Sequence, residues 1–400
     1  MKQESPFTPG SPVPYEFFVG RQKEIEEILT SVRRAASGRQ QNVFLVGERG
    51  IGKSSLAHYV RDLAVKQYNF LTVHVLLGGV TTLEELVRRV FERIANEAHA
   101  RRWFEKISDV FGGRIQQVGF FAVSLGFNAP ESDLSHLVRD FPEAINKINE
   151  KIKDKIKGIL VVLDDINGIC KKDDFANWYK SCVDHIALHY RGFPVLIMPV
   201  AIPEIRLRLG EQQPSLMRVF KVVEIEGLSD DEVRAFLTRA FESVGVKASS
   251  EVIGVMVSYS GGLPIVMQEI GDAVFTANKD DLIDEDDSIK GLMTAAETMG
   301  QKYLEPRVYQ AIRSKRYRSI LRKLGSLRPL AHFKKAEIQS KLNVDEKKVL
   351  HNFLRRMREL GVVLQDKERE RGWYKFTNPL YPLYISMEGI RYRERPRNRR

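Results

Sequence analysis

Short apolar runs alternate with amphipathic segments over the first half of the chain. Runs that are apolar on both faces are typical of strands buried in a parallel sheet, and they lie at residues 43–46, 70–77, 158–163 and 193–200. Apolar residues three or four positions apart between Ile25 and Val32 predict an amphipathic helix over residues 22–36. Strands that alternate with helices predict an α/β fold built on a parallel sheet.

The pattern changes near residue 227, where strands give way to helices. Ser229 and Glu232 have the spacing of a capping box, and helical periodicity follows them. We expect a small helical domain here, and an exposed linker over the acidic residues 280–287 because like charges repel each other. Within the α/β body, residues 118–127 are apolar and spaced by glycines, which predicts an inserted strand pair.

The last hundred residues have the pattern of three helices followed by two strands. The predicted helices span residues 320–327, 334–342 and 345–360, and the predicted strands span residues 362–364 and 373–376. Three helices and a β-hairpin make a winged helix-turn-helix. In the third helix, Leu350, Phe353 and Met357 lie in the apolar stripe and are expected in the core.

The segment after the first buried run has the pattern GxxxxGK[ST]. It reads G-E-R-G-I-G-K-S and stands between a predicted strand and a predicted helix. Backbone N–H groups of such a glycine-rich loop converge on an anion at the helix N-terminus. Lys53 is expected to reach the β- and γ-phosphates and to act in catalysis, and Ser54 to ligate Mg²⁺. The predicted nucleotide-binding residues of this loop are Gly47, Glu48, Arg49, Gly50, Ile51, Gly52, Lys53, Ser54 and Ser55.

Two carboxylates follow the third apolar run. Asp164 and Asp165 stand at the carboxyl end of a buried strand, where ligands bind in parallel sheets. Asp164 is expected to hold Mg²⁺, and Asp165 to orient or deprotonate the attacking water as a catalytic residue. An insertion is expected between the two motifs, since 111 residues separate Lys53 from Asp164. The sequence therefore predicts a Mg²⁺-dependent site for a nucleoside triphosphate.

Charge is distributed unevenly along the chain. Residues 301–400 hold 27 Lys and Arg against 10 Asp and Glu, a net charge of +17, whereas the whole chain carries +11. A basic domain beside a mildly acidic body indicates a polyanionic partner such as nucleic acid. The two cysteines and the absence of a long apolar run indicate a reduced, cytoplasmic setting without membrane contact.

These motifs resemble the AAA+/STAND class of P-loop ATPases, and within it the archaeal and bacterial ATPases related to origin-recognition-type initiators. Phe18-Val19-Gly20-Arg21 with Glu24 resembles a segment that lines the adenine pocket, which implies contacts from Gly20 and Arg21. Ser260 to Pro264 resemble the GGLP motif of the helical lid, which implies a nucleotide contact from Pro264. Together the patterns predict five parts: a Pro-rich, extended arm (1–18), an ATPase domain (19–226), a helical lid (227–300), a winged helix (301–390) and a basic tail (391–400).

The sequence departs from these relatives at several positions. An Asp-Asp pair replaces the Asp-Glu of most AAA+ motors, which implies slow ATP hydrolysis of the kind found in switches. Arg218 matches by position the segment that supplies an arginine finger in trans, and a plain surface arginine is the alternative. The resemblance to AAA+ proteins implies self-assembly into a homo-oligomer, a claim that Arg218 alone cannot carry.

Two interpretations of the winged helix stay open. In the first, DNA is the partner and is bound mostly without sequence preference, because charge supplies affinity rather than specificity. In the second, the domain binds a protein partner, as in STAND signalling or scaffold ATPases. The alternating charges of residues 366–371 favour the second, and the net charge favours the first. The predicted DNA-binding residues are Lys347, Lys348, Asn352, Arg355 and Arg371.

Overall fold

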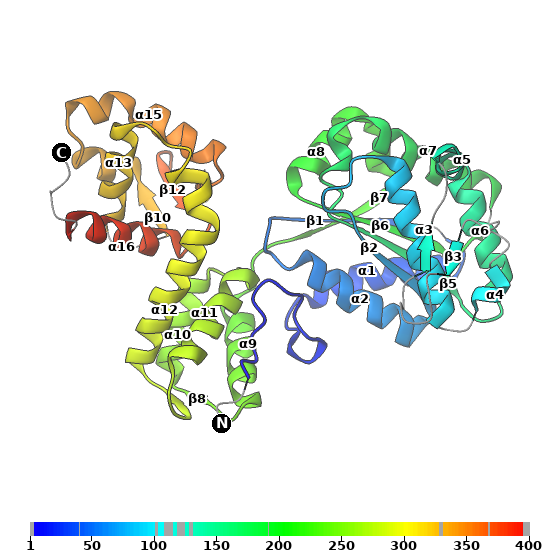
Figure 1. Cartoon of the computed structure of the whole chain (residues 1–400), viewed down its shortest axis with the longest axis horizontal. Coiled ribbons are helices and arrows are strands. Elements are labelled where there is room, and N and C mark those ends of the chain that lie inside the picture. The colour runs from blue at the N-terminus through cyan, green and yellow to red at the C-terminus, as the bar shows by residue number, and fades with distance from the viewer. Residues whose placement is uncertain are drawn as a thin grey trace. The chain divides into compact units, whose positions relative to one another are not determined.

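The chain folds into two compact units that are joined by two crossings of the backbone (Figure 1). One unit is Arg21–Glu226, and the other combines Met1–Gly20 with Gly227–Arg400. The structure is a computed structural model that describes residues 4–39, 41–100, 103–107, 115–117, 125–127, 131–190, 192–327, 331–366 and 369–394. No helix in this described part of the chain is long and apolar enough to cross a membrane.

A five-stranded parallel sheet forms the centre of the unit Arg21–Glu226. Its strands are β1 (Asn42–Gly47), β2 (Phe70–Leu76), β5 (Gly158–Asp164), β6 (Val195–Ala201) and β7 (Phe220–Ile225). They lie in the order β2-β5-β6-β1-β7, and every neighbouring pair is parallel. All residues of β1, β5 and β6 are buried, which explains why these strands are apolar at nearly every position. The predicted α/β fold is confirmed.

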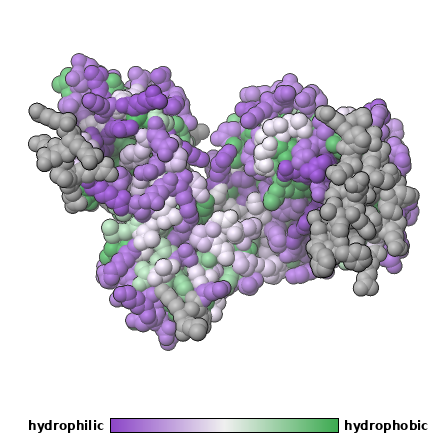
Figure 2. All heavy atoms as spheres, viewed as in Figure 1, coloured by the Kyte–Doolittle hydropathy of each residue, from purple (hydrophilic) through white to green (hydrophobic). Residues whose placement is uncertain are grey.

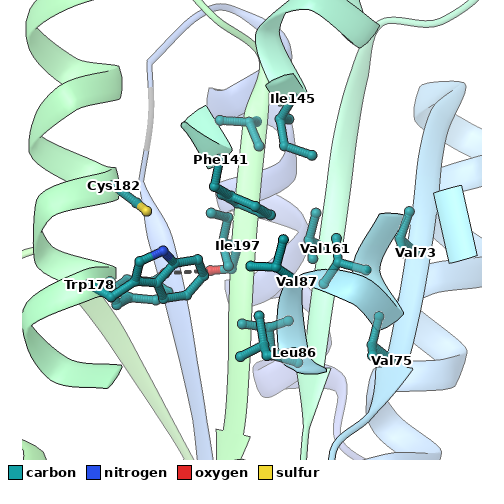
Figure 3. Packing of buried hydrophobic residues seen from close by; sticks show 14 of the residues in the cluster. Val73, Val75, Leu86, Val87, Phe141, Ile145, Val161, Trp178, Cys182 and Ile197 are labelled. Carbon is teal, nitrogen blue, oxygen red and sulfur yellow. Dashed lines mark hydrogen bonds between the residues drawn. The ribbon is translucent and has the colours of Figure 1, made fainter. Parts of the chain in front are cut away.

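Helices pack on this sheet and close its core. They are α1 (Gln22–Ala36), α2 (Lys53–Tyr68), α3 (Leu83–Ala100), α4 (Phe104–Ile107), α5 (Glu131–Arg139), α6 (Phe141–Ile152), α7 (Asp174–His189) and α8 (Pro203–Gln212), with 3₁₀ helices η3 (Ile169–Lys171) and η4 (Pro214–Arg218). Figure 3 shows side chains of α6 and α7 beside those of the central strands. The rings of Phe141 and Trp178 meet edge to face, with centroids 5.2 Å apart. This rigid core fixes the ends of the strands, where the predicted site lies.

The insertion expected in this unit is present as a strand pair. β3 (Ile115–Gln117) and β4 (Leu125–Phe127) are antiparallel, so the first strand precedes the predicted range 118–127. Residues 118–124 of that range lie outside the described residues.

The second unit begins with a helical part that has its own apolar core. Its elements are α9 (Asp230–Ser243), α10 (Ser250–Ser260), α11 (Pro264–Ala277), α12 (Glu285–Met299), the short strands β8 (Lys247–Ala248) and β9 (Leu282–Ile283), and the 3₁₀ helix η1 (Tyr15–Phe17). The capping box of Ser229 and Glu232 starts α9, as predicted.

The acidic stretch 280–287 is exposed at most positions, as predicted, but it is not a linker, and that part of the prediction is wrong. Leu282 and Ile283 pair with β8 as strand β9, and Ile283 is buried. The Asp284 side chain accepts a hydrogen bond from the Asp287 backbone N–H, and Asp287 completes a capping box at the start of α12. Carboxylates at a helix N-terminus are stabilised by the unpaired N–H groups and the helix dipole, so the negative charges serve a cap.

The C-terminal part is a winged helix with a separate core. The π-helix η5 (Gly300–Tyr309) continues α12 into this core through Leu304 and Val308. It is followed by α13 (Lys315–Gly325), β10 (His332–Lys334), α14 (Lys335–Ser340), α15 (Val344–Glu359), β11 (Val363–Gln365), β12 (Trp373–Phe376) and α16 (Tyr381–Glu394). The strands form an antiparallel sheet in the order β10-β12-β11. The predicted winged helix-turn-helix is confirmed, with β10 and α16 as additional elements.

The N-terminal arm packs into the core of the helical part. Phe7 is only 3% exposed, and its ring meets Phe236 and Phe241 edge to face at 5.8 and 5.0 Å. Gly271 leaves room for this ring, since a Cβ there would lie 2.2 Å from Phe7. The Thr8 backbone N–H donates to the Gln268 side chain at 2.8 Å. The arm is therefore a structural part of this unit.

Replacing Phe7 with alanine is expected to destabilise the helical part by about 3 kcal/mol, because it removes a buried aromatic side chain and leaves a cavity. Urea unfolding followed by circular dichroism measures this loss. Tyr15→Ala is the matched control, because Tyr15 lies on the same arm and is 43% exposed. Equal effects of the two substitutions would contradict a packing role for Phe7.

Candidate nucleotide site

The glycine-rich loop follows β1 and leads directly into α2. Gly50 and Gly52 have positive φ angles of 76° and 93°, so side chains at these positions would be strained. Gly47 is tightly enclosed, since a Cβ there would lie within 2.9 Å of both Ile225 and Ile51. Lys53 is the first residue of α2, and the exposed Ser54 follows it. The loop thus brings backbone N–H groups, a cation and a hydroxyl together at one helix N-terminus.

The ammonium group of Lys53 bends back over the loop. Its Nζ donates to the carbonyl oxygens of Gly47 at 2.8 Å and Glu48 at 2.7 Å. Burial lowers the pKa of Lys53, and the carboxylates of Asp164, Glu48 and Asp165 oppose that shift, in this order of size. The predicted phosphate-binding lysine and the predicted metal-binding carboxylates therefore lie close enough to interact electrostatically.

Asp164 is the last residue of β5 and is held by a histidine that the sequence analysis missed. Its Oδ2 lies 3.0 Å from Nε2 of His74 on the neighbouring strand β2. Both side chains are almost fully buried, 4% exposed for Asp164 and 9% for His74. A buried carboxylate needs such a partner. Because the contact holds Oδ2, it also fixes the orientation of the other carboxylate oxygen of Asp164, Oδ1. The signal in the sequence is a polar residue inside an otherwise apolar strand.

Asp165 has an unusual backbone conformation and a second partner that was not predicted. Its φ angle of 60° lies in the left-handed region, which non-glycine residues seldom adopt. The Nδ2 of Asn167 donates to its Oδ1, and the Oδ1 of Asn167 accepts from the backbone N–H of Ile202 at 3.3 Å. Asn167 thus connects Asp165 to the end of β6. Strained residues with several constraints are frequent at functional sites.

Further carboxylates surround the loop. Partial burial raises the pKa of Glu48, with Glu204 and Glu224 adding to the shift and Lys53 opposing it. Glu204 lies in the first turn of α8, directly after β6, and Glu224 lies on β7. β6 and β7 are the two neighbours of β1, so these acids flank the phosphate-binding loop. Glu204 and Glu224 were absent from the sequence prediction because only the strand order brings them to the loop.

The donor set fits a magnesium ion. Mg²⁺ binds oxygen ligands and usually takes one or two carboxylates together with phosphates and water. Ser54 and Asp164 supply a hydroxyl and a carboxylate, and Asp165 follows at the same sheet edge. In the described part of the chain no cluster of three His, Cys, Asp or Glu residues could enclose a metal by itself. Ser54 and Asp164 leave the remaining ligand positions of such an ion to phosphate and water.

Comparison with known proteins found one matching family model and several solved structures of similar fold. Residues 18–178 match the family model of the AAA ATPase domain. This stretch of the chain is similar to AAA ATPase domains. The Walker-type ATPase PabY2304 of Pyrococcus abyssi has a similar fold, with a TM-score of 0.57 and 16% identity over 92% of this chain and 96% of that one. The ORC2 protein of Aeropyrum pernix also gives a TM-score of 0.57, with 13% identity over 97% of this chain and 96% of that one.

One curated relative of this chain is named as a helix-turn-helix protein. An uncharacterised HTH-type transcriptional regulator of Methanocaldococcus jannaschii is 23% identical over 251 residues, 59% of this chain. The match spans about half of that relative, 56% of its length.

Arg21 connects the glycine-rich loop to the edge of its unit. The side chain is buried, and one terminal nitrogen donates to the carbonyl oxygens of Ile51, at 3.3 Å, and Glu226. The same guanidinium lies 3.6 Å from Glu24. Residues 20–21 and 226–227 are the two crossings between the units. Arg21, which lies at one crossing, is therefore hydrogen-bonded both to the loop and to Glu226 at the other crossing. The adenine contact expected of Arg21 stays a prediction.

Arg218, predicted as a catalytic residue, lies outside the cluster formed by the loop, Asp164 and Asp165. Arg218 ends η4 just before β7 begins, whereas the glycine-rich loop follows the carboxyl end of β1. Because β1 and β7 are parallel and in register from Asn42 and Phe220, Arg218 lies at the opposite edge of the sheet. Gly20 and Pro264 belong to the other unit, where Gly20 lies beside Glu232 and Pro264 starts α11.

The basic residues of the winged helix lie on its surface. Lys347, Lys348, Asn352 and Arg355 are exposed along α15, opposite the buried Leu350, Phe353 and Met357. Arg371 is exposed in the turn before β12. Figure 2 shows mostly hydrophilic residues over α13 and α15 on the face in view. The end of the predicted basic tail, residues 395–400, lies outside the described residues, and Arg391 belongs to α16 and pairs with Glu297 at 2.6 Å.

Proposed function

We propose that this protein is an ATP-binding and ATP-hydrolysing switch that couples its nucleotide state to DNA binding through the winged helix. The observation that carries the first half is the convergence of Lys53, Asp164 and Asp165 at one edge of the sheet. The AAA ATPase domain over residues 18–178 supports the choice of nucleotide. The HTH-type regulator similar to this chain supports the second half.

Each residue of the site has a distinct role in this proposal. Lys53 leaves the carbonyls of Gly47 and Glu48 and binds the β- and γ-phosphates, while the backbone N–H groups of residues 47–55 surround them. Ser54 and Asp164 hold Mg²⁺, and His74 fixes the orientation of Asp164. The ion neutralises charge on the phosphates when it is bound. Asp165 orients the attacking water, with Asn167 holding one of its oxygens.

Slow turnover is part of the proposal. Asp165 has a shorter side chain than the glutamate of most AAA+ motors, and it is constrained by a left-handed backbone. Arg218 cannot reach the loop of its own chain from the opposite sheet edge, so it can act in hydrolysis only at the site of a second copy. Hydrolysis would then depend on self-assembly.

The coupling rests on Arg21. Since its guanidinium binds both the loop at Ile51 and the crossing at Glu226, a movement of the loop on nucleotide binding is transmitted to the junction of the units. The cytoplasm is the proposed location, in keeping with a nucleotide-dependent DNA-binding protein.

The winged helix offers DNA a helix with exposed cations. In the described part of α15 the exposed cations are Lys347, Lys348, Arg355, Arg356 and Arg358. Several of them are paired at the surface, as Lys348 with Asp345 at 3.4 Å and Arg356 with Glu359 at 3.1 Å. Such exposed pairs contribute little to stability, so phosphates can replace the carboxylates at small cost. We therefore favour DNA as the partner.

Fluorescence anisotropy of a labelled random duplex tests the DNA half. Binding is expected to weaken steeply between roughly 50 and 200 mM salt, because contacts to DNA phosphates release counterions. Binding is also expected to differ between ATP and ADP, because the proposal couples DNA affinity to the nucleotide state. The double variant Lys348→Ala/Arg355→Ala is expected to lower the slope of log affinity against log salt by about two. Lys247→Ala is the control, since Lys247 is exposed in the same unit but far along the chain from α15.

Absence of duplex binding in every nucleotide state would refute the DNA half of the proposal. It would leave the protein partner of a STAND-like scaffold as the function of the winged helix. A nucleotide-independent affinity would refute only the coupling through Arg21.

A further inference from the structure

A cavity of about 760 Å³ opens at the amino-terminal edge of the sheet in the unit Arg21–Glu226. Its walls come from the end of α1, the start of β1, the second half of α7 and the segment between η4 and β7. β1 runs from Asn42, in this cavity, to Gly47 at the glycine-rich loop, a distance of roughly 16 Å along the strand. The cavity is therefore separate from the nucleotide site.

The charged groups of the cavity are mostly cationic. Arg34, Arg39 and Arg218 line it, and all three are exposed. Among the described lining residues the one carboxylate is that of Asp184, which is paired with Lys180 one turn earlier on α7. Three guanidinium groups around one opening repel each other, and a bound anion relieves that repulsion.

Neutral groups of the lining favour a ligand over bulk water. The Asn42 side chain is 1% exposed, and its Oδ1 accepts from the Ile197 backbone N–H at 3.0 Å. Its Nδ2 donates to no atom among the described residues, which leaves a buried donor at the base of the cavity. Tyr190 and Phe193 add aromatic surface. The wall thus combines polar and apolar groups, and the volume of the cavity lies within the usual range of small-molecule sites.

We infer that this arginine-lined cavity is a second ligand site, which binds the polyphosphate part of a free small molecule. Guanidinium groups recognise phosphate through paired N–H donors, which explains three arginines where lysines would supply charge alone. The same phosphate chemistry could be presented by a nucleotide bound to a second copy of the chain. The inference commits to the free ligand, and the experiment separates the two sources.

Isothermal titration of inorganic tripolyphosphate into the full-length Lys53→Ala protein tests the inference. The P-loop of this variant is disabled, so a second copy carries no nucleotide. One binding site per chain is expected. Arg34→Ala or Arg218→Ala should weaken it about 10- to 100-fold, because each removes charge-assisted hydrogen bonds. Arg33→Ala is the matched control, since Arg33 neighbours Arg34 on α1 but pairs with Glu26 and does not line the cavity.

Two results would overturn the inference. One is that tripolyphosphate does not bind to Lys53→Ala. If ATP-dependent self-association of the wild type then required Arg218, the arginines would serve a second copy of the chain. The other is binding that Arg33→Ala weakens as much as Arg34→Ala. Should Lys53→Ala fail to fold, the wild type is titrated instead. The wild type should then bind two tripolyphosphate ions per chain, one at the loop and one in the cavity, and the variant Arg34→Ala/Arg218→Ala should bind one.

Discussion

Lys53→Ala is expected to lower the affinity for ATP at the glycine-rich loop at least about 100-fold. The variant loses a cation that would donate charge-assisted hydrogen bonds to the phosphates, and each such bond contributes about 1.5–3 kcal/mol. The structure adds a second effect. Lys53 Nζ donates to the carbonyl oxygens of Gly47 and Glu48, so its removal also leaves these oxygens of the loop without that donor. A fluorescent ATP analogue at increasing protein concentration measures the change.

Lys66→Ala is the matched control for this experiment. Lys66 lies in the last turn of the same helix α2 and is exposed. Its substitution changes the net charge equally but leaves the loop intact, so ATP affinity should stay within about twofold of wild type. Normal ATP binding by Lys53→Ala, with a wild-type unfolding curve, would mean that the loop is not the nucleotide site.

The sequence was sufficient for the loop and for the pair of carboxylates. A glycine-rich loop between strand and helix has one geometry, which local residues determine through positive φ angles at Gly50 and Gly52. Asp164 and Asp165 could be placed at a sheet edge because β5 is apolar throughout and ends there. That all strands are parallel followed from the alternation with helices.

The partners of these residues could not be predicted, because they depend on strand order. β6 lies between β1 and β5, and β2 lies beside β5. Only this order brings His74 to Asp164 and connects Asn167 with the backbone after β6. Nothing local in the sequence distinguishes it from other orders of five parallel strands. The role of Arg21 was missed for the same reason, since Ile51 and Glu226 are 30 and 205 residues away.

Composition was misleading where charge serves local structure. The acidic stretch 280–287 suggested a linker, yet its carboxylates cap α12 and its apolar pair forms β9. The Pro-rich arm likewise suggested an extended segment, yet Phe7 fills a space in the helical core that Gly271 leaves open. The packing is determined by Leu282 and Ile283 in the acidic stretch and by Phe7 in the arm. One or two apolar residues are too few to produce a periodic pattern in the sequence.

Asp165→Ala is expected to keep ATP affinity within a few-fold of wild type and to lower the rate of phosphate release at saturating ATP about 100- to 10,000-fold. This range is the usual contribution of a positioned acid or base. Alanine tolerates the left-handed backbone at this position poorly, so Asp165→Asn is the second variant. Asparagine adopts φ near 60° readily and retains the shape of the aspartate side chain. Both variants should lose turnover.

Asn167 and Asp173 supply the graded and the neutral comparison. Asn167→Ala removes the donor to Asp165 Oδ1 while leaving the carboxylate, so it should lower the maximal rate less than Asp165→Asn and leave the Michaelis constant for ATP unchanged. Asp173→Ala removes an exposed carboxylate of the same segment whose side chain caps nothing, and its rate should equal that of wild type. If Asp165→Asn kept more than about a tenth of the wild-type rate, the water would be oriented by another group. Glu204, in the first turn of α8, would then be the first residue to substitute.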